Sequence, residues 1–146
     1  MKKQIILCAL VLFAMAALNV SCKKEDNSSP NTGGSSSPTL TSILTAGSWR
    51  IHYYHESNED HTANFNGYTF VFNGNGTMTA TNSSGTTNGT WSIDDSNANE
   101  MHMSCGSSAP LSDLNNGWLV ISKTTTEIHL KDDDTAHNEE VHFVKI

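Results

Sequence analysis

The stretch from Phe65 to Ile93 constrains the fold most, because it reads as consecutive strands joined by tight turns. Phe70 and Phe72 are two residues apart, so both side chains point to the same face of an extended chain. The run 73–76, Asn-Gly-Asn-Gly, then interrupts the alternation, and Asn-Gly between alternating segments is a strong hairpin signal. Alternation resumes over 77–81. The pattern therefore predicts an antiparallel meander.

Two registers are open to this first hairpin. A two-residue loop pairs Phe72 with Thr77, whereas a three-residue loop pairs Phe72 with Met78 and Phe70 with Ala80. The three-residue loop keeps apolar side chains together on one face. It also places Gly76 at a bulged turn position that needs a positive φ, which glycine adopts without strain. We expect the three-residue loop.

The rest of the chain from residue 39 continues this rhythm of short strands. A short helical turn over 39–44 comes first, a polar turn is expected over 82–88, and an irregular connection with a helical turn over 106–116. The expected strands are 49–54, the segment of Phe70 and Phe72, 77–81, 89–93, 100–105, 118–122, 127–130 and 140–146. Eight strands are the number found in the smallest ligand-holding barrels. The predicted fold is an all-β, eight-stranded antiparallel up-and-down barrel.

The N-terminal segment has the composition of a secretion signal. Lys2 and Lys3 precede an uncharged, mostly apolar run from Ile5 to Leu18, which is too short for a typical membrane span and suits a signal sequence. Residues 27–38 then contain Ser, Asn, Gly, Thr and Pro without an apolar anchor, which predicts disorder. The predicted organisation is a signal peptide at 1–21, a linker at 22–38 and a barrel domain at 39–146.

Ser21-Cys22 at the end of this signal resembles the lipobox of bacterial lipoproteins, although Asn19 occupies the place where that family prefers leucine. The resemblance implies cleavage before Cys22 and a lipid, palmitate included, on that cysteine. An ordinary secretory signal beside a free cysteine is the alternative.

Lys24-Glu25-Asp26 resembles the surface-export signal of some Gram-negative lipoproteins. It implies anchoring in the outer membrane with the domain exposed on the cell surface. A periplasm-facing anchor is the alternative.

The net charge argues against one class of partner, and the cysteine positions argue against a disulfide. The formal net charge of −7 argues against a nucleic-acid partner, since phosphates are bound by Lys and Arg. Once the signal is removed and Cys22 carries lipid, Cys105 is left alone and no intrachain disulfide can form. Cys105 shares its strand parity with Met101 and Met103, which predicts a buried thiol rather than a nucleophile.

Several motifs together resemble the lipocalin-like domains of bacterial surface lipoproteins. They are Gly47-Ser48-Trp49, Gly67-Tyr68-Thr69-Phe70, Asn75-Gly76-Thr77, Gly89-Thr90-Trp91, and Leu114 before Trp118. The resemblance spans about 39–146 and implies an up-and-down barrel with a cup, which binds an apolar or amphipathic ligand in some members. The sequence departs from lipocalins in lacking a C-terminal helix and a C-terminal arginine over the first tryptophan, where Lys145 stands instead.

An inward-facing set of aromatic and methionine side chains could line a ligand cavity, since such walls suit flat or flexible apolar ligands. The ligand-binding residues predicted from the alternation are Tyr53, Tyr68, Phe70, Phe72, Trp91, Met101 and Met103. The alternative is a core filled by its own side chains, which eight strands permit.

Three histidines are expected to meet on the outer face. If Leu130 pairs with Val141, then His129 lies opposite His142, and closure of the barrel brings His52 beside them. Three imidazoles could bind zinc or copper, or could be ordinary solvated side chains. The sequence by itself assigns no metal and no cofactor.

The sequence contains no Gly-x-Ser-x-Gly and no His-Glu-x-x-His motif, and the acidic run 132–134 lacks the spacing of an EF-hand. We therefore expect a solvated acidic turn at 132–138 and no enzyme activity. The expected function is that of a lipid-anchored envelope protein that binds a small apolar or glycan-derived ligand. The alternative is an accessory surface protein with a filled barrel and no ligand.

Overall fold

The computed structural model describes residues 37–94, 96 and 99–146, which belong to the compact unit Ser35–Ile146. The predicted signal peptide, Cys22 and most of the linker lie outside the described residues. Within the described part of the chain, no helix is long and apolar enough to cross a membrane.

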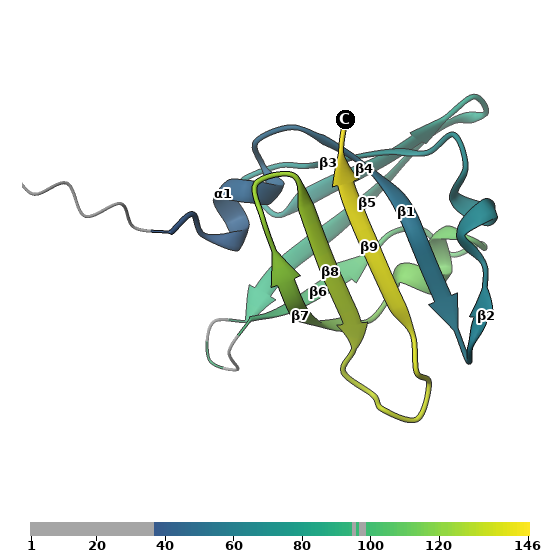
Figure 1. Ribbon diagram of the computed structural model, residues 1–146. Coiled ribbons are helices and arrows are strands. Elements are labelled where there is room, and N and C mark those ends of the chain that lie inside the picture. The colour runs from purple at the N-terminus through teal and green to yellow at the C-terminus, as the bar shows by residue number, and fades with distance from the viewer. Residues whose placement is uncertain (1–36, 95, 97–98) are drawn as a thin grey trace, which may run out of the picture. The chain divides into compact units, whose positions relative to one another are not determined.

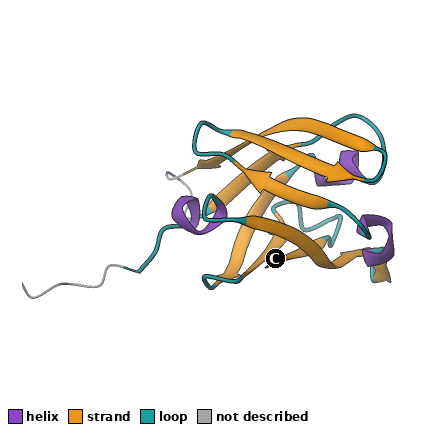
Figure 2. Cartoon of the chain, turned by 90° about the horizontal axis from the view of Figure 1, so that it is seen from above, coloured by secondary structure: helices purple, strands orange, loops and turns teal. Residues whose placement is uncertain are grey.

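The described chain forms an antiparallel sheet that closes on itself, because β1 pairs with β9 as well as with β3 (Figures 1 and 2). Eight strands make the barrel, and the two-residue β2 extends the edge of β1, so the predicted eight-stranded barrel is confirmed. In order, the elements are α1 (Leu40–Leu44), β1 (Ser48–Glu56), β2 (Glu59–Asp60), the 3₁₀ helix η1 (Thr62–Phe65), β3 (Thr69–Phe72), β4 (Thr77–Asn82), β5 (Gly85–Asp94), β6 (Glu100–Ser104), the 3₁₀ helix η3 (Leu111–Leu114), β7 (Gly117–Lys123), β8 (Glu127–Asp132) and β9 (Glu140–Lys145).

The register predicted for the β3–β4 hairpin is confirmed. Phe72 pairs with Met78 and Phe70 pairs with Ala80, and Gly76 has a φ of +82°. The expected long turn over 82–88 is wrong, because Asn82 already pairs with Gly85. Threonines extend both strands there, and cross-strand threonine pairs stabilise antiparallel sheets.

One prediction for β1 is wrong in parity. The alternation predicts that Tyr53 points inward, but the inward tyrosine is Tyr54, which is fully buried. The reason is a β-bulge: the register with β9 shifts between Ile51 and Tyr53, so His52 and Tyr53 both face outward. A bulge inserts one residue and reverses the alternation beyond it.

Trp49 and Trp118 connect the short helices α1 and η3 to the strands of the barrel. Trp49 Nε1 donates to the carbonyl oxygen of Leu44 at 2.9 Å, and Trp118 Nε1 donates to that of Leu114 at 3.1 Å. These bonds hold α1 and η3, whose apolar side chains are buried, and they give each indole N–H the partner it needs when buried. Lys145 Nζ lies 5.9 Å from the centroid of the Trp49 ring.

Candidate functional site

The structure places most of the predicted ligand-binding residues in a packed core. Phe70, Phe72, Met101 and Met103 are buried, and Trp91 is 6% exposed. The ring centroids of Phe70 and Phe143 lie 5.5 Å apart, and those of Phe72 and Trp91 lie 5.8 Å apart, both edge to face. Such contacts mean that these side chains fill space that a ligand would need.

The other two predicted ligand residues lie elsewhere. Tyr53 is on the outer face because of the bulge, so its assignment to an inner cavity is wrong. Tyr68 is half-buried and lines several surface hollows. One, of about 320 Å³, is shared with Thr87, with the loop residues 106–109 and with Leu111. Another is a pocket of about 210 Å³ that Tyr68 lines with residues of β1, of the segment from η1 to β3, and of the C-terminus.

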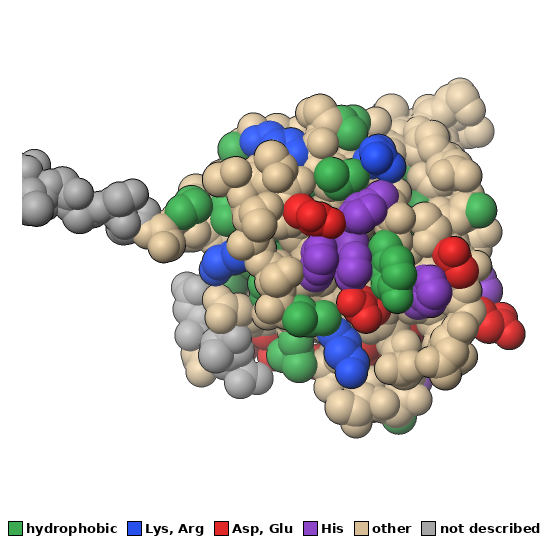
Figure 3. Space-filling view, in the orientation of Figure 1, with side chains coloured by type: hydrophobic (Ala, Val, Ile, Leu, Met, Phe, Trp, Pro, Cys, Tyr) green, Lys and Arg blue, Asp and Glu red, His purple; other side chains and the backbone are tan. Residues whose placement is uncertain are grey.

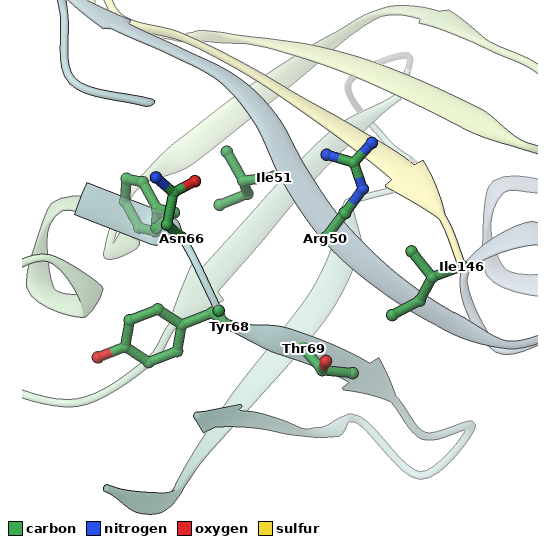
Figure 4. A pocket seen from close by; sticks show the side chains of 8 residues that line it. Arg50, Ile51, Asn66, Tyr68, Thr69 and Ile146 are labelled. Atoms are coloured by element: carbon green, nitrogen blue, oxygen red, sulfur yellow. The ribbon is translucent and has the colours of Figure 1, made fainter. Parts of the chain in front are cut away.

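This pocket occupies a gap between β1 and β3 (Figure 4). The two strands pair only at Ser48 and Trp49, and beyond these residues they diverge. The guanidinium of Arg50 and the hydroxyl of Tyr68 point in different directions. The volume is below the roughly 300 Å³ at which ligand pockets usually begin, and its polar groups do not converge. The gap is therefore a poor ligand site.

A more organised arrangement lies on the outer face of β8, β9 and β1, where histidine side chains gather with acidic side chains beside them (Figure 3). We call His52, Glu127, His129, Glu140 and His142 the histidine cluster. The predicted pairing of His129 with His142 is confirmed, and their rings stack at 3.7 Å with planes 7° apart. The ring of His52 lies 5.8 Å from that of His142, tilted by 52°.

Two carboxylates hold these rings. Glu127 Oε1 lies 3.0 Å from His52 Nε2 and 2.9 Å from His129 Nε2, so it bridges two strands. Glu140 Oε1 lies 2.7 Å from His142 Nε2. The candidate ligand atoms of His52, Glu127 and His142 all lie within 4.8 Å of one another.

The aromatic stack continues beyond the cluster. Tyr53 stacks on His142 with ring centroids 4.3 Å apart and on His55 at 4.2 Å. His142 is the most buried of these histidines, with 14% of its side chain exposed. The bulge at His52 thus places two successive side chains of β1 against one histidine of β9.

Within the cluster, the electrostatics favour the neutral imidazole of His142 and the ionised carboxylate of Glu127. Partial burial lowers the pKa of His142, and the neighbouring His129 and His52 lower it further, although the hydrogen bond to Glu140 opposes them. The hydrogen bond from His129 lowers the pKa of Glu127. A neutral imidazole has a nitrogen lone pair available to a metal.

Sequence reasoning identified the three histidines but missed the two carboxylates. The signal is a Glu-x-His pattern, because residues two apart on a strand share a face. It occurs at Glu127-His129 and Glu140-His142, and again in β6, where Glu100 lies 3.2 Å from His102.

Two other expectations concern single groups. The burial expected of the Cys105 thiol is confirmed; it is fully buried, and burial raises its pKa.

The expectation of a solvated acidic turn is wrong for Asp132, which is 1% exposed. Its carboxylate accepts from the backbone N–H of Asp134 at 2.9 Å and contacts His137 Nδ1 at 3.2 Å. This aspartate organises the β8–β9 turn.

Comparison with known proteins yields a fold relationship. No family model matches the sequence, and no curated protein matches it significantly. A solved structure that is similar is that of a DUF4847 family protein from Bacteroides vulgatus, with 16% sequence identity and a TM-score of 0.54. The match covers 73% of this chain and 96% of that one. At this identity the likeness establishes that the two chains share the barrel fold.

Proposed function

We propose that this protein is a non-catalytic lipoprotein of the outer membrane, anchored through Cys22, whose barrel presents its outer surface at the cell surface. In this function the barrel is an accessory surface module, and its interior is structural. The membrane is its partner through the lipid, and no nucleic acid is involved. The observation that carries the scaffold role is the packed interior.

The interior supports a scaffold rather than a carrier. Trp49, Phe70, Phe72 and Phe143 are each no more than 1% exposed, and Phe143 packs edge to face against both Phe70 and Phe72. A carrier needs a cavity that buries most of its ligand. Opening one here requires displacing several aromatic rings, each of which contributes strongly to stability.

The lipid anchor is supported by the sequence Ser21-Cys22 and by the polar linker that follows it. The test is fractionation of cells that express the full chain or its Cys22→Ser variant. We expect the wild type in the outer-membrane fraction, with the mass of a lipid on Cys22, and the variant in the soluble fraction. Equal distribution of the two proteins would contradict the anchor. Protease treatment of intact cells then distinguishes surface exposure from a periplasm-facing anchor.

The scaffold function is tested separately by native mass spectrometry of the protein purified from its own membranes. We expect the mass of the lipidated chain with no further small molecule. A stoichiometric apolar or glycan-derived compound that persists through purification would instead establish the carrier function and reject the packed interior as the working state. Phe72→Ala is the matched variant, because it opens space beside Trp91. If the interior of the wild type is closed, this variant should bind an added hydrophobic dye more tightly than the wild type does. If the wild type already has a cavity, the two proteins should bind the dye alike.

A further inference from the structure

We propose that the histidine cluster binds one divalent transition-metal ion of the zinc type, with His52, Glu127 and His142 as its protein ligands. This inference goes beyond the function proposed above and does not depend on it. The site lies across the line where the first strand of the barrel meets the last, with one ligand from each of β1, β8 and β9.

The distances suit such an ion after small side-chain movements. Zinc binds imidazole nitrogen and carboxylate oxygen at about 2.0–2.2 Å, which places donors of a tetrahedral site about 3.3–3.6 Å apart. His52 Nε2 and Glu127 Oε1 are already 3.0 Å apart, and all three candidate donors lie within 4.8 Å of one another. An adjustment of about an ångström completes the set, and solvent supplies the fourth ligand, since the cluster faces water.

The other two members of the cluster hold the ligands in place. The ring of His129 is parallel to that of His142, so the in-plane lone pairs of the two rings cannot point at one ion. His129 contacts Glu127 Oε1 at 2.9 Å and is a positioning residue. Glu140 Oε1 lies 2.7 Å from His142 Nε2 and fixes that ring. Hydrogen-bonded outer groups of this kind typically account for about tenfold to 100-fold in metal affinity.

The chemistry of the donors selects the ion. Two imidazoles and one carboxylate suit zinc, copper or nickel, whereas calcium and magnesium need oxygen ligands. The net charge of −7 attracts cations in general. If the rings serve only as cross-strand stacking pairs, the protein should bind zinc no more tightly than magnesium. Selectivity for zinc over magnesium therefore separates the two interpretations.

The test is Zn²⁺ titration of the purified full-length protein without an affinity tag, by calorimetry and by NMR of the histidine rings. We expect one saturable site, displacement of the His52 and His142 resonances, and no response to Mg²⁺. Glu127→Gln keeps the shape of the side chain and should weaken zinc binding at least tenfold, as should His142→Ala. His129→Ala removes a positioning residue and should weaken binding by about tenfold, the lower end of the range for an outer group.

The matched controls are His61→Ala, in the turn before η1, and His137→Ala, which removes a histidine from a different acidic cluster next to Asp132. Both should bind zinc as the wild type does. The proposal is overturned if the wild type shows no saturable binding below about 1 mM, or if Glu127→Gln and His142→Ala both retain wild-type affinity. Loss of binding in His137→Ala with Glu127→Gln unaffected would move the site to the other cluster. Circular dichroism of every variant separates lost binding from lost folding.

Discussion

The two edges of β1 are built differently. On one edge β1 pairs with β9 from Trp49 to His55, with a single bulge. On the other edge it pairs with β3 only at Ser48 and Trp49. Further along this edge, the backbone N–H of Tyr54 donates to Thr62 Oγ1 at 2.9 Å. The backbone carbonyl of Tyr54 accepts from the N–H of His61.

This difference teaches how a barrel can close without uniform pairing. The edge toward β9 is closed by backbone hydrogen bonds and carries the histidine cluster outside and Phe143 inside. The edge toward β3 is completed by the short strand β2, by the N–H of His61 and by the hydroxyl of Thr62, which satisfy backbone groups of β1 that would otherwise be unpaired. We therefore expect the first edge to carry most of the stability and the second to open first.

The largest expected effect comes from the interior of the closed edge. Phe143→Ala should lower the free energy of unfolding by about 3–5 kcal/mol, because it leaves a cavity between Phe70 and Phe72. Urea denaturation measures the change. Ile121→Ala is the control, since Ile121 is 54% exposed and should change stability by no more than about 0.5 kcal/mol. Similar losses in both variants would mean that the interior is not packed as described.

The next effect depends on metal at the same edge. Zinc at 100 times its dissociation constant should raise the free energy of unfolding by about 2.7 kcal/mol, because the ion binds only the folded cluster. EDTA should abolish the gain. Hydrogen exchange should slow at the amides between β1 and β9 more than at those near η1. Uniform slowing would show that the ion does not act at the closed edge.

A smaller effect is expected on the open edge. Thr62→Ala removes the acceptor of the Tyr54 N–H and should cost about 1–2 kcal/mol, the usual penalty for an unpaired buried donor. Thr62→Ser keeps the hydroxyl and should restore most of the stability. If alanine and serine behave alike, the hydroxyl does not close this edge.

The smallest effect is a pH dependence of the folding stability that comes from Glu139, in the turn before β9. Burial, Asp132 and Glu56 raise the pKa of Glu139 above its usual value. The folded protein therefore holds the Glu139 proton to higher pH than the unfolded chain, so this group favours folding in acid and that contribution is lost as pH rises through its folded pKa. Glu139→Gln should be more stable than the wild type at pH 7, by less than about 1 kcal/mol because the group is partly solvated, and equally stable at pH 4. Denaturation midpoints at the two pH values measure this, and a variant that is less stable at pH 7 would contradict it.

Local patterns were sufficient to predict much of the fold. Alternation with a glycine at the required turn position fixed the register of Phe72 with Met78, and apolar parity fixed that of Leu130 with Val141. The turn between β4 and β5 was misplaced because threonine and asparagine occur in both turns and strands.

The candidate site was only half predictable, for physical reasons. The histidines follow from strand pairing, and their carboxylates could have been found from the Glu-x-His spacing. The outward position of Tyr53 could not have been predicted, because a bulge depends on how β1 pairs with β9. The sequence Tyr53-Tyr54 also offers an aromatic side chain to either face, so it does not indicate which of the two is buried. Whether inward aromatic residues line a cavity or fill it depends on packing in three dimensions, which alternation does not encode.

The extra residue in β1 adds a side chain to the outside of the barrel and leaves the core unchanged. Deleting the codon for His52 would restore simple alternation with Tyr53 still outward and Tyr54 still inward, and would remove one proposed ligand. The chemistry of the exterior can therefore change in evolution while the contents of the core stay the same. Strand length at this position becomes a genetic marker for the outer cluster.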